Sequence, residues 1–260
     1  MSNGTVLITG GTGAIGAALC AGFHDRGYTV VANCHPADVE RSEAALAALR
    51  TEHGIHAELV PFDVTDHDAA RTAIDGFEDD TGAIDILVNN AGMQHVAPVE
   101  DFPPDQWDKI IALNLTAAFH TTRHAVPAMK EKGWGRIINT ASAHSLTASP
   151  FKSAYNASKH GIAGFTKTIA LELAQTGVTA NCISPGYVWT PLIEGQIPDT
   201  MKARGLSREE VINDVLLAKQ PTKKFVQPAE VGALAVFLCR EEAGNVTGAN
   251  WSIDGGWTAE

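Results

Sequence analysis

Three residues of the sequence could together hold a reacting oxygen and move a proton: Ser142, Tyr155 and Lys159. Tyr155 and Lys159 are four positions apart in a segment of helical periodicity, so their side chains project from one helix face. An ammonium close to a phenol favours the phenolate and lowers the pKa of the tyrosine from its usual value of about 10. Such a tyrosine can act as acid or base near neutral pH. Most Tyr-x-x-x-Lys pairs lie by chance on a solvated helix face, so this pair needs support from other positions.

A glycine-rich turn at residues 9–16 follows the first apolar run and precedes a helical segment. Backbone N–H groups at such a turn, together with the positive end of the helix, can hold a pyrophosphate. The alternative is an ordinary tight turn between a strand and a helix. Residues 89–92, Asn-Asn-Ala-Gly, end a later strand, where ligands of open α/β sheets bind, although a plain Asn-Gly turn has the same appearance.

Short β-branched runs alternate with longer helical segments along the whole chain. Several runs are apolar at consecutive positions, which is typical of strands buried on both faces of a parallel sheet. We therefore expect a single α/β domain over residues 1–260, with a doubly wound parallel sheet and helices on both faces. Residues 185–224 are polar and rich in Gly and Pro around a helical segment at 207–218, which predicts a substrate lid within that domain. The seven expected strands are 5–9, 29–33, 58–62, 84–89, 136–140, 178–183 and 251–253.

Composition excludes several classes of function. The chain has 30 acidic and 19 basic residues, a net charge of -11 and 45% apolar residues, so we expect neither a disordered tail nor a nucleic-acid partner. No apolar stretch approaches the roughly 20 residues that span a bilayer. We expect no membrane partner, no leader peptide and a cytoplasmic location. The four cysteines fall in apolar segments without metal-ligand spacing, which predicts reduced packing residues and no metal site.

These motifs resemble the short-chain dehydrogenase/reductase family, in which they recur in this order before a Pro-Gly, here Pro185-Gly186. The resemblance covers essentially the whole chain and implies a Rossmann-type sheet of seven strands, a nicotinamide cofactor, a homotetramer, and catalytic roles for Ser142, Tyr155 and Lys159. It also implies that Asn114 holds a water in a proton relay, although a helix-interior Asn bonded to backbone is the alternative. The implied cofactor-binding residues are Gly10, Thr12, Gly13, Ile15, Gly16, Asp63, Val64, Asn90, Ala91, Gly92, Tyr155, Lys159, Pro185, Gly186, Val188 and Thr190.

The end of the second strand bears on the choice of nucleotide. A carboxylate there would bind the ribose 2′-hydroxyl of NAD, whereas a basic residue would suit the 2′-phosphate of NADP. The nearest acid is Asp38, and no Lys or Arg lies between Arg26 and Arg41, so we expect NAD. Asp63, which the resemblance places beside the adenine, could instead cap the next helix. Ala14 stands where the family's turn carries a glycine, and we expect its methyl group to shift the cofactor slightly.

Residues 132–171 contain five basic residues and no acid, so we expect positive charge to concentrate around the site and attract an anion. Within the family, His144 and the segments 149–155, 196–198 and 254–257 are most similar to bacterial (R)-3-hydroxybutyrate dehydrogenases. This implies reversible oxidation of (R)-3-hydroxybutyrate to acetoacetate with NAD, a reaction of ketone body metabolism. The implied substrate-binding residues are Gln94, Ser142, His144, Lys152, Tyr155, Gln196 and Trp257, of which Gln94 and Gln196 could equally be surface residues. Two alternatives stay open: an NADPH-dependent acetoacetyl-CoA reductase and a non-catalytic dinucleotide sensor.

Overall fold

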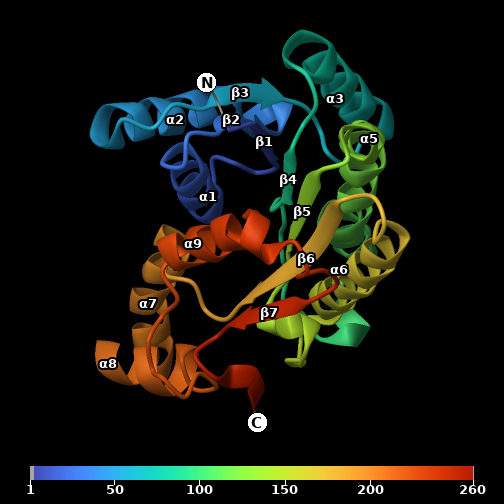
Figure 1. Ribbon diagram of the computed structural model, residues 1–260. Helices are drawn as coiled ribbons and strands as arrows, with labels where there is room; N and C mark the ends of the chain where they lie inside the picture. The colour runs from blue at the N-terminus through green and yellow to red at the C-terminus, as the bar shows by residue number, and fades with distance from the viewer. Residues whose placement is uncertain (1–2, 260) are drawn as a thin grey trace.

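The computed structural model describes residues 3–259, without the side chains of residues 79–81 and 192. Within these residues, seven parallel strands form one sheet in the order β3-β2-β1-β4-β5-β6-β7 (Figure 1). The limits of each strand differ from the sequence prediction by no more than two residues. The strands are β1 Thr5–Ile8, β2 Thr29–Cys34, β3 Glu58–Pro61, β4 Ile86–Asn89, β5 Gly135–Thr140, β6 Val178–Pro185 and β7 Asn250–Ile253.

Helices cover both faces of the sheet (Figure 1). Leu7 and Ile8 are adjacent in β1 but belong to two different buried clusters, because successive side chains of a strand point to opposite faces. Ile8 packs with α1 and α9, and Leu7 packs with α3, α5 and α6. The expected doubly wound fold is confirmed. The helices of these layers are α1 Ala14–His24, α2 Val39–His53, α3 His67–Thr81, α5 Ala117–Lys132, α6 Ser153–Glu172 and α9 Pro228–Leu238.

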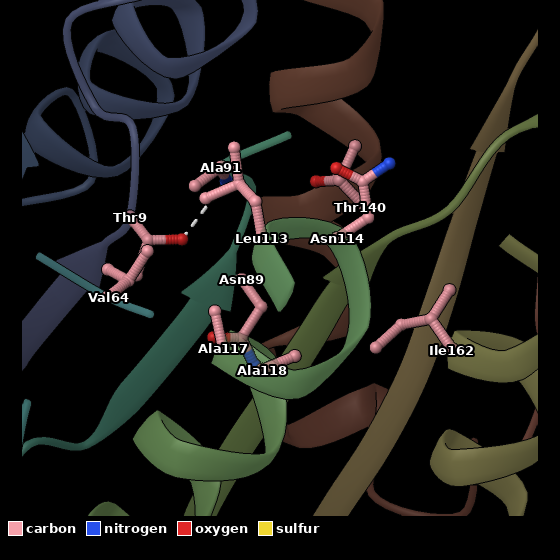
Figure 2. Close-up of a pocket in the computed structure, with 10 residues that line it drawn as sticks. All are labelled: Thr9, Val64, Asn89, Ala91, Leu113, Asn114, Ala117, Ala118, Thr140 and Ile162. Carbon is pink, nitrogen blue, oxygen red and sulfur yellow. Dashed lines mark hydrogen bonds between the residues drawn. The ribbon is translucent and has the colours of Figure 1, made fainter. Parts of the chain in front are cut away.

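The strand order reverses between β1 and β4, which are neighbours in the sheet. At such a switch point the loops after the two strands diverge and leave a crevice at their carboxyl ends. Here the two loops are tied together at their base, because the N–H groups of Asn90 and Ala91 donate to Thr9 Oγ1 at 2.9 and 3.1 Å. Figure 2 shows the second of these bonds.

Residues 185–224 contain more helix than the sequence pattern predicted. The helix α7, Pro191–Arg204, was not expected, because Gly195 and Pro198 inside it are poor helix formers. Thr190 caps its start by accepting a hydrogen bond from the Ile193 N–H at 3.3 Å. The short helix α8, Arg208–Glu210, and the π-helical turn η5, Val211–Leu216, occupy the segment where a helix was expected. In Figure 1, α7 and α8 project beyond the sheet at the end where the C-terminus lies.

All four cysteines are buried and free, as expected of reduced packing residues. No helix in residues 3–259 is both long enough and apolar enough to cross a membrane.

Candidate active site

One cavity of about 340 Å³ collects most of the predicted site residues at the carboxyl ends of β4, β5 and β6. Gln196 is not among its lining residues and lies exposed on α7. The predicted residues that do line the cavity are Ile15, Asn90, Gly92, Gln94, Ser142, His144, Lys152, Tyr155, Lys159, Pro185, Gly186, Val188, Thr190 and Trp257. The structure therefore brings together side chains that are up to 242 positions apart in the sequence.

Ser142, Tyr155 and Lys159 meet in this cavity because β5 ends beside the start of α6. Ser142 follows β5 by two residues, and its Oγ accepts a hydrogen bond from the His144 N–H at 3.2 Å. One helical turn separates Tyr155 from Lys159, so the Lys159 Nζ lies 5.6 Å from the centre of the Tyr155 ring. The same ammonium donates a hydrogen bond to the Thr140 carbonyl at 2.7 Å.

The ionisation of this pair differs from the expectation. Burial raises the pKa of Tyr155 above its usual value, and the hydrogen bond with Ser142 opposes that effect only in part. Burial also lowers the pKa of Lys159 to about 8. The expected lowering of the Tyr155 pKa by Lys159 is therefore wrong for the protein without ligands, because the desolvation of a buried charge outweighs attraction across this distance. Near pH 7 the Tyr155 phenol is therefore neutral, whereas the Lys159 ammonium keeps most of its charge.

Asn114 lies in a π-helical turn, η3 Ala112–Thr116, between α4 Pro104–Ile111 and α5. Its side chain pairs with the backbone of Met93: Oδ1 accepts from the Met93 N–H and Nδ2 donates to the Met93 carbonyl, both at 2.9 Å. This is the backbone-bonded arrangement that the sequence left open. Asn114 also lines, with Thr9, Asn89 and Thr140, a cavity of about 10 Å³ shown in Figure 2. Such a volume is about the room that one water molecule requires.

The glycine-rich turn packs too tightly for side chains at two positions. A Cβ at Gly16 would lie 2.2 Å from the Gly10 carbonyl oxygen, and one at Gly11 would lie 2.7 Å from the Ala32 Cβ. Gly13 precedes α1 without a side-chain cap, and the first turn of the helix holds no acid. The N–H groups at the start of α1 therefore keep their hydrogen-bonding capacity for an anionic group. The Thr12 hydroxyl, in contrast, is 3.0 Å from the Ser42 hydroxyl of α2.

Asp63 follows β3 and folds the chain locally. Its Oδ1 accepts hydrogen bonds from the Thr65 N–H at 2.8 Å and the Thr65 hydroxyl at 2.7 Å. Burial acts to raise its pKa, but these bonds and His35 together hold the pKa below its usual value. Asp66, not Asp63, caps α3, so the capping alternative for Asp63 is wrong. Val64 is buried and lines the small cavity of Figure 2.

His144 lines the large cavity beside Ser142 and Tyr155. Its Nδ1 is 3.3 Å from the Ser142 Oγ, and its Nε2 is 2.9 Å from the Ser149 Oγ. Burial lowers the pKa of His144 to about 4, with a further contribution from Lys152. The imidazole is therefore neutral near pH 7 and can offer one N–H donor. Burial also lowers the pKa of Lys152, which enters the cavity from the residue before α6.

Two aromatic rings, those of Trp257 and Tyr187, line the cavity beside His144. The Trp257 ring meets the edge of His144 at 5.1 Å between ring centres and stacks on Tyr187 at 5.8 Å, with 6° between the planes. Trp257 was expected here, whereas Tyr187 was missed. The position of Tyr187 directly after Pro185-Gly186 was the signal in the sequence that could have indicated a cavity residue.

The geometry described above agrees with three comparisons. A family model for short chain dehydrogenases matches residues 4–200. The chain belongs to the short chain dehydrogenase family. D-beta-hydroxybutyrate dehydrogenase from Rhizobium meliloti (strain 1021) is 50% identical over 258 residues, which cover 98% of this chain and 99% of that protein. A protein of the same name from Cupriavidus necator is 50% identical over 262 residues and covers both chains fully.

A solved member of the family shares the whole architecture. The structure of L-sorbose reductase from Gluconobacter frateurii, complexed with NADPH and L-sorbose, matches with a TM-score of 0.91 and 29% sequence identity. The match covers 100% of this chain and 98% of that one. Within the family's usual glycine turn, the departure at Ala14 leaves an exposed methyl group at the first position of α1.

Only part of the basic segment 132–171 contributes to the cavity of this chain. Lys152 and Lys159 line the cavity, and no carboxylate of the described side chains does. Lys132 instead pairs with the buried Asp85, and the Arg136 guanidinium stacks on Trp134 at 4.5 Å from the ring centre. Local positive charge at the cavity thus comes from the buried Lys159 and the partly buried Lys152.

The buried His144 predicts acid-sensitive stability. A histidine whose pKa is about 4 in the folded chain and about 6.5 in the unfolded chain binds more protons when unfolded, so stability is lost as pH falls below 6.5. We expect this residue to remove about 1.5 kcal/mol from the free energy of unfolding between pH 6.5 and pH 5. Urea unfolding at both pH values should show a smaller loss in His144→Gln, but an unchanged loss in a variant of the exposed His53.

Proposed function

We propose that the protein catalyses the reversible oxidation of (R)-3-hydroxybutyrate to acetoacetate with NAD. One observation carries this proposal: Lys152 and His144 line the same cavity as Ser142 and Tyr155. The cavity therefore offers a cation and a neutral donor for a carboxylate at one end, and an acid-base pair for a hydroxyl group at the other. The two relatives with half of their residues identical to this chain support the same substrate.

The catalytic roles follow from the contacts at the hydroxyl end. Ser142 holds the reacting oxygen, Tyr155 takes up the hydroxyl proton, and Lys159 provides a nearby charge. When bound, oxidised NAD supplies the hydride acceptor and an additional positive charge. Because burial makes the neutral phenol the favoured form without ligands, Tyr155 receives its base character only in the loaded site. Asn114 positions the water that passes the proton on from Lys159.

The carboxylate end is assigned to Lys152, His144 and Gln94, with Trp257 as the apolar wall. Hydrogen bonds to a charged group contribute about 1.5–3 kcal/mol each, so this set can select an acid over an uncharged analogue. Gln196 is exposed, and it joins the set when residues 185–224 close over the cavity as a lid. Closure of this kind excludes water and completes a site.

The cofactor assignment rests on the glycine turn and the end of β2. Gly16 and Gly11 let the turn pack closely on its own backbone and on Ala32, and the start of α1 offers its N–H groups. Arg41, the nearest cation beyond β2, is paired with Asp38 at 3.1 Å. A 2′-phosphate would therefore compete with Asp38 for Arg41, the first cation after β2 in the sequence. This competition favours NAD over NADP.

The decisive experiment is an absorbance assay at 340 nm with both enantiomers of 3-hydroxybutyrate and both nucleotides. We expect turnover of the (R) enantiomer and a kcat/KM at least about tenfold higher with NAD than with NADP, as one unfavourable charged contact would give. Acetoacetyl-CoA plus NADPH is the competing pair. Faster turnover of that pair would reject the proposal, because a thioester leaves the buried Lys152 without a carboxylate. Absence of any hydride transfer would indicate a sensor.

The homotetramer and the cytoplasmic location stay predictions. Exposed apolar side chains on α5 and α6 support an assembly: Phe119 is 44% exposed and Leu171 is 79% exposed. Helices of this kind need a partner surface to remove apolar groups from water. Sedimentation equilibrium of the parent, with Leu171→Glu for comparison, would test the predicted assembly.

A further inference from the structure

Gln220 lies where residues 185–224 return to the body of the protein, and its side chain is 1% exposed. Its Oε1 accepts a hydrogen bond from the Tyr187 N–H at 2.8 Å, and its Nε2 donates to the Lys224 carbonyl at 2.6 Å. Both ends of this buried amide are therefore paired. Loss of the bond to Tyr187 leaves a partly buried N–H without a partner, which costs free energy.

Two glycines make room for the Gln220 side chain. A Cβ at Gly186 would lie 2.5 Å from the Gln220 Oε1, and a Cβ at Gly255 would lie 3.0 Å from the Gln220 Cγ. Gly186 directly precedes Tyr187, and Gly255 stands two residues before Trp257. Gln220 thus packs against both chain segments that carry the stacked rings.

The two rings line the cavity, whereas Gln220 is not among its lining residues. The neighbouring Lys219 lies over Trp257, and its Nζ is 5.8 Å from the centre of the Trp257 ring. Gln220 therefore acts on the cavity through the segments that line it, which are Gly186-Tyr187 and Trp257. The stack of the two rings in turn sets the position of the indole that faces His144.

We propose that Gln220 is a positioning residue that holds Tyr187 and Trp257 at the spacing required by the substrate. The proposal rests on the proposed function, since it takes the cavity beside these rings as the site of the hydroxybutyrate chain. Gln220 touches no reacting group, so its loss weakens substrate binding more than it slows the chemical step. The same side chain also anchors the end of the predicted lid to the wall of the cavity.

The test compares two buried side-chain amides, each of which bonds to backbone groups of a distant segment. Gln220→Met keeps the length of the side chain but can neither accept from Tyr187 nor donate to Lys224. Asn181 is the matched control: its Nδ2 donates to the Val246 carbonyl at 2.6 Å and its Oδ1 accepts from the Ala249 N–H at 3.1 Å, away from the cavity. Both Q220M and N181L should lower the melting temperature.

Only Q220M should change substrate binding. We expect its KM for (R)-3-hydroxybutyrate to rise about tenfold, as for the loss of a buried hydrogen bond, with KM for NAD within twofold of the parent. A milder variant, Gln220→Glu, keeps an acceptor for Tyr187, and its KM should fall between the parent and Q220M. If Q220M does not fold, a raised KM in Q220E alone supports the proposal. An unchanged KM in the folded variants, despite a lowered melting temperature, would overturn it.

Hydrogen exchange separates this proposal from the proposed function. Peptides that cover residues 185–190 and 253–259 should exchange faster in Q220M than in the parent or N181L, without any substrate present. If the parent fails to oxidise hydroxybutyrate while this exchange is faster, the function is wrong and the positioning of the wall stands. Unchanged exchange in both peptides would reject the positioning role itself.

Discussion

Replacing Tyr155 with Phe is expected to lower kcat for (R)-3-hydroxybutyrate by at least about 10³-fold, within the range that general acid-base groups contribute. The change removes the phenolic oxygen that is proposed to accept the substrate proton and leaves the ring in place. The edge contact between His144 and Tyr155, at 5.7 Å between ring centres, involves only that ring and should survive. The variant therefore tests proton transfer with little disturbance of the cavity.

Three measurements make the Tyr155→Phe result specific. The dissociation constant for NADH, measured by fluorescence, should stay within a few-fold of the parent. Tyr28→Phe serves as the matched control, because Tyr28 packs against Phe23 under β2, remote from the cavity. Its turnover should equal that of the parent. Turnover by Tyr155→Phe near the parent rate would remove Tyr155 from the mechanism.

Lys152→Gln is expected to raise KM for (R)-3-hydroxybutyrate about 10- to 100-fold with a smaller effect on kcat. The magnitude follows from losing one charge-assisted hydrogen bond, about 1.5–3 kcal/mol. Among the described side chains that line that end of the cavity Lys152 is the only cation, and Lys219 lies over the Trp257 ring without lining the cavity. Binding is affected more than chemistry because the carboxylate keeps its charge throughout the reaction.

The neutral methyl ester of the substrate provides the control reaction for Lys152→Gln. Parent and variant should differ little on the ester, because it carries no charge for Lys152 to meet. Lys167→Gln, an exposed change on α6, which begins directly after Lys152, should leave KM for both compounds unchanged. An equal rise in KM for the acid and the ester would show that Lys152 shapes the cavity without reading charge.

The sequence was sufficient to predict the sheet, because the pattern that indicates each strand lies within a few neighbouring residues. Adjacent apolar residues such as Leu7 and Ile8 required two buried faces, and the structure places them in two separate clusters. The motif residues likewise follow strand ends, and parallel strands bring those ends to one edge. The sequence alone, without any knowledge of distances, therefore predicted thirteen positions that line the same cavity as Tyr155.

What the sequence could not provide depends on long-range contacts. The pKa of Tyr155 reflects burial by segments that only the folded chain brings together, and spacing along a helix contains no measure of it. Tyr187 became visible as a wall residue only through its stack on Trp257, 70 positions later. The helix α7 was missed because Thr190 stabilises its start, whereas its interior Gly195 and Pro198 argue against a helix.

The π-helical turn at Asn114 limits which length changes this region can accept in natural variation. Such a turn holds one residue more than an α-helical turn, so deleting a residue there would convert it into regular helix. Everything downstream in α5 would then rotate by about 100° about the helix axis. Thr121, whose hydroxyl donates to the Asn89 Oδ1 at 2.6 Å, would turn away from the sheet. We expect homologous chains to conserve Asn114 and the number of residues in this turn, while its other positions vary.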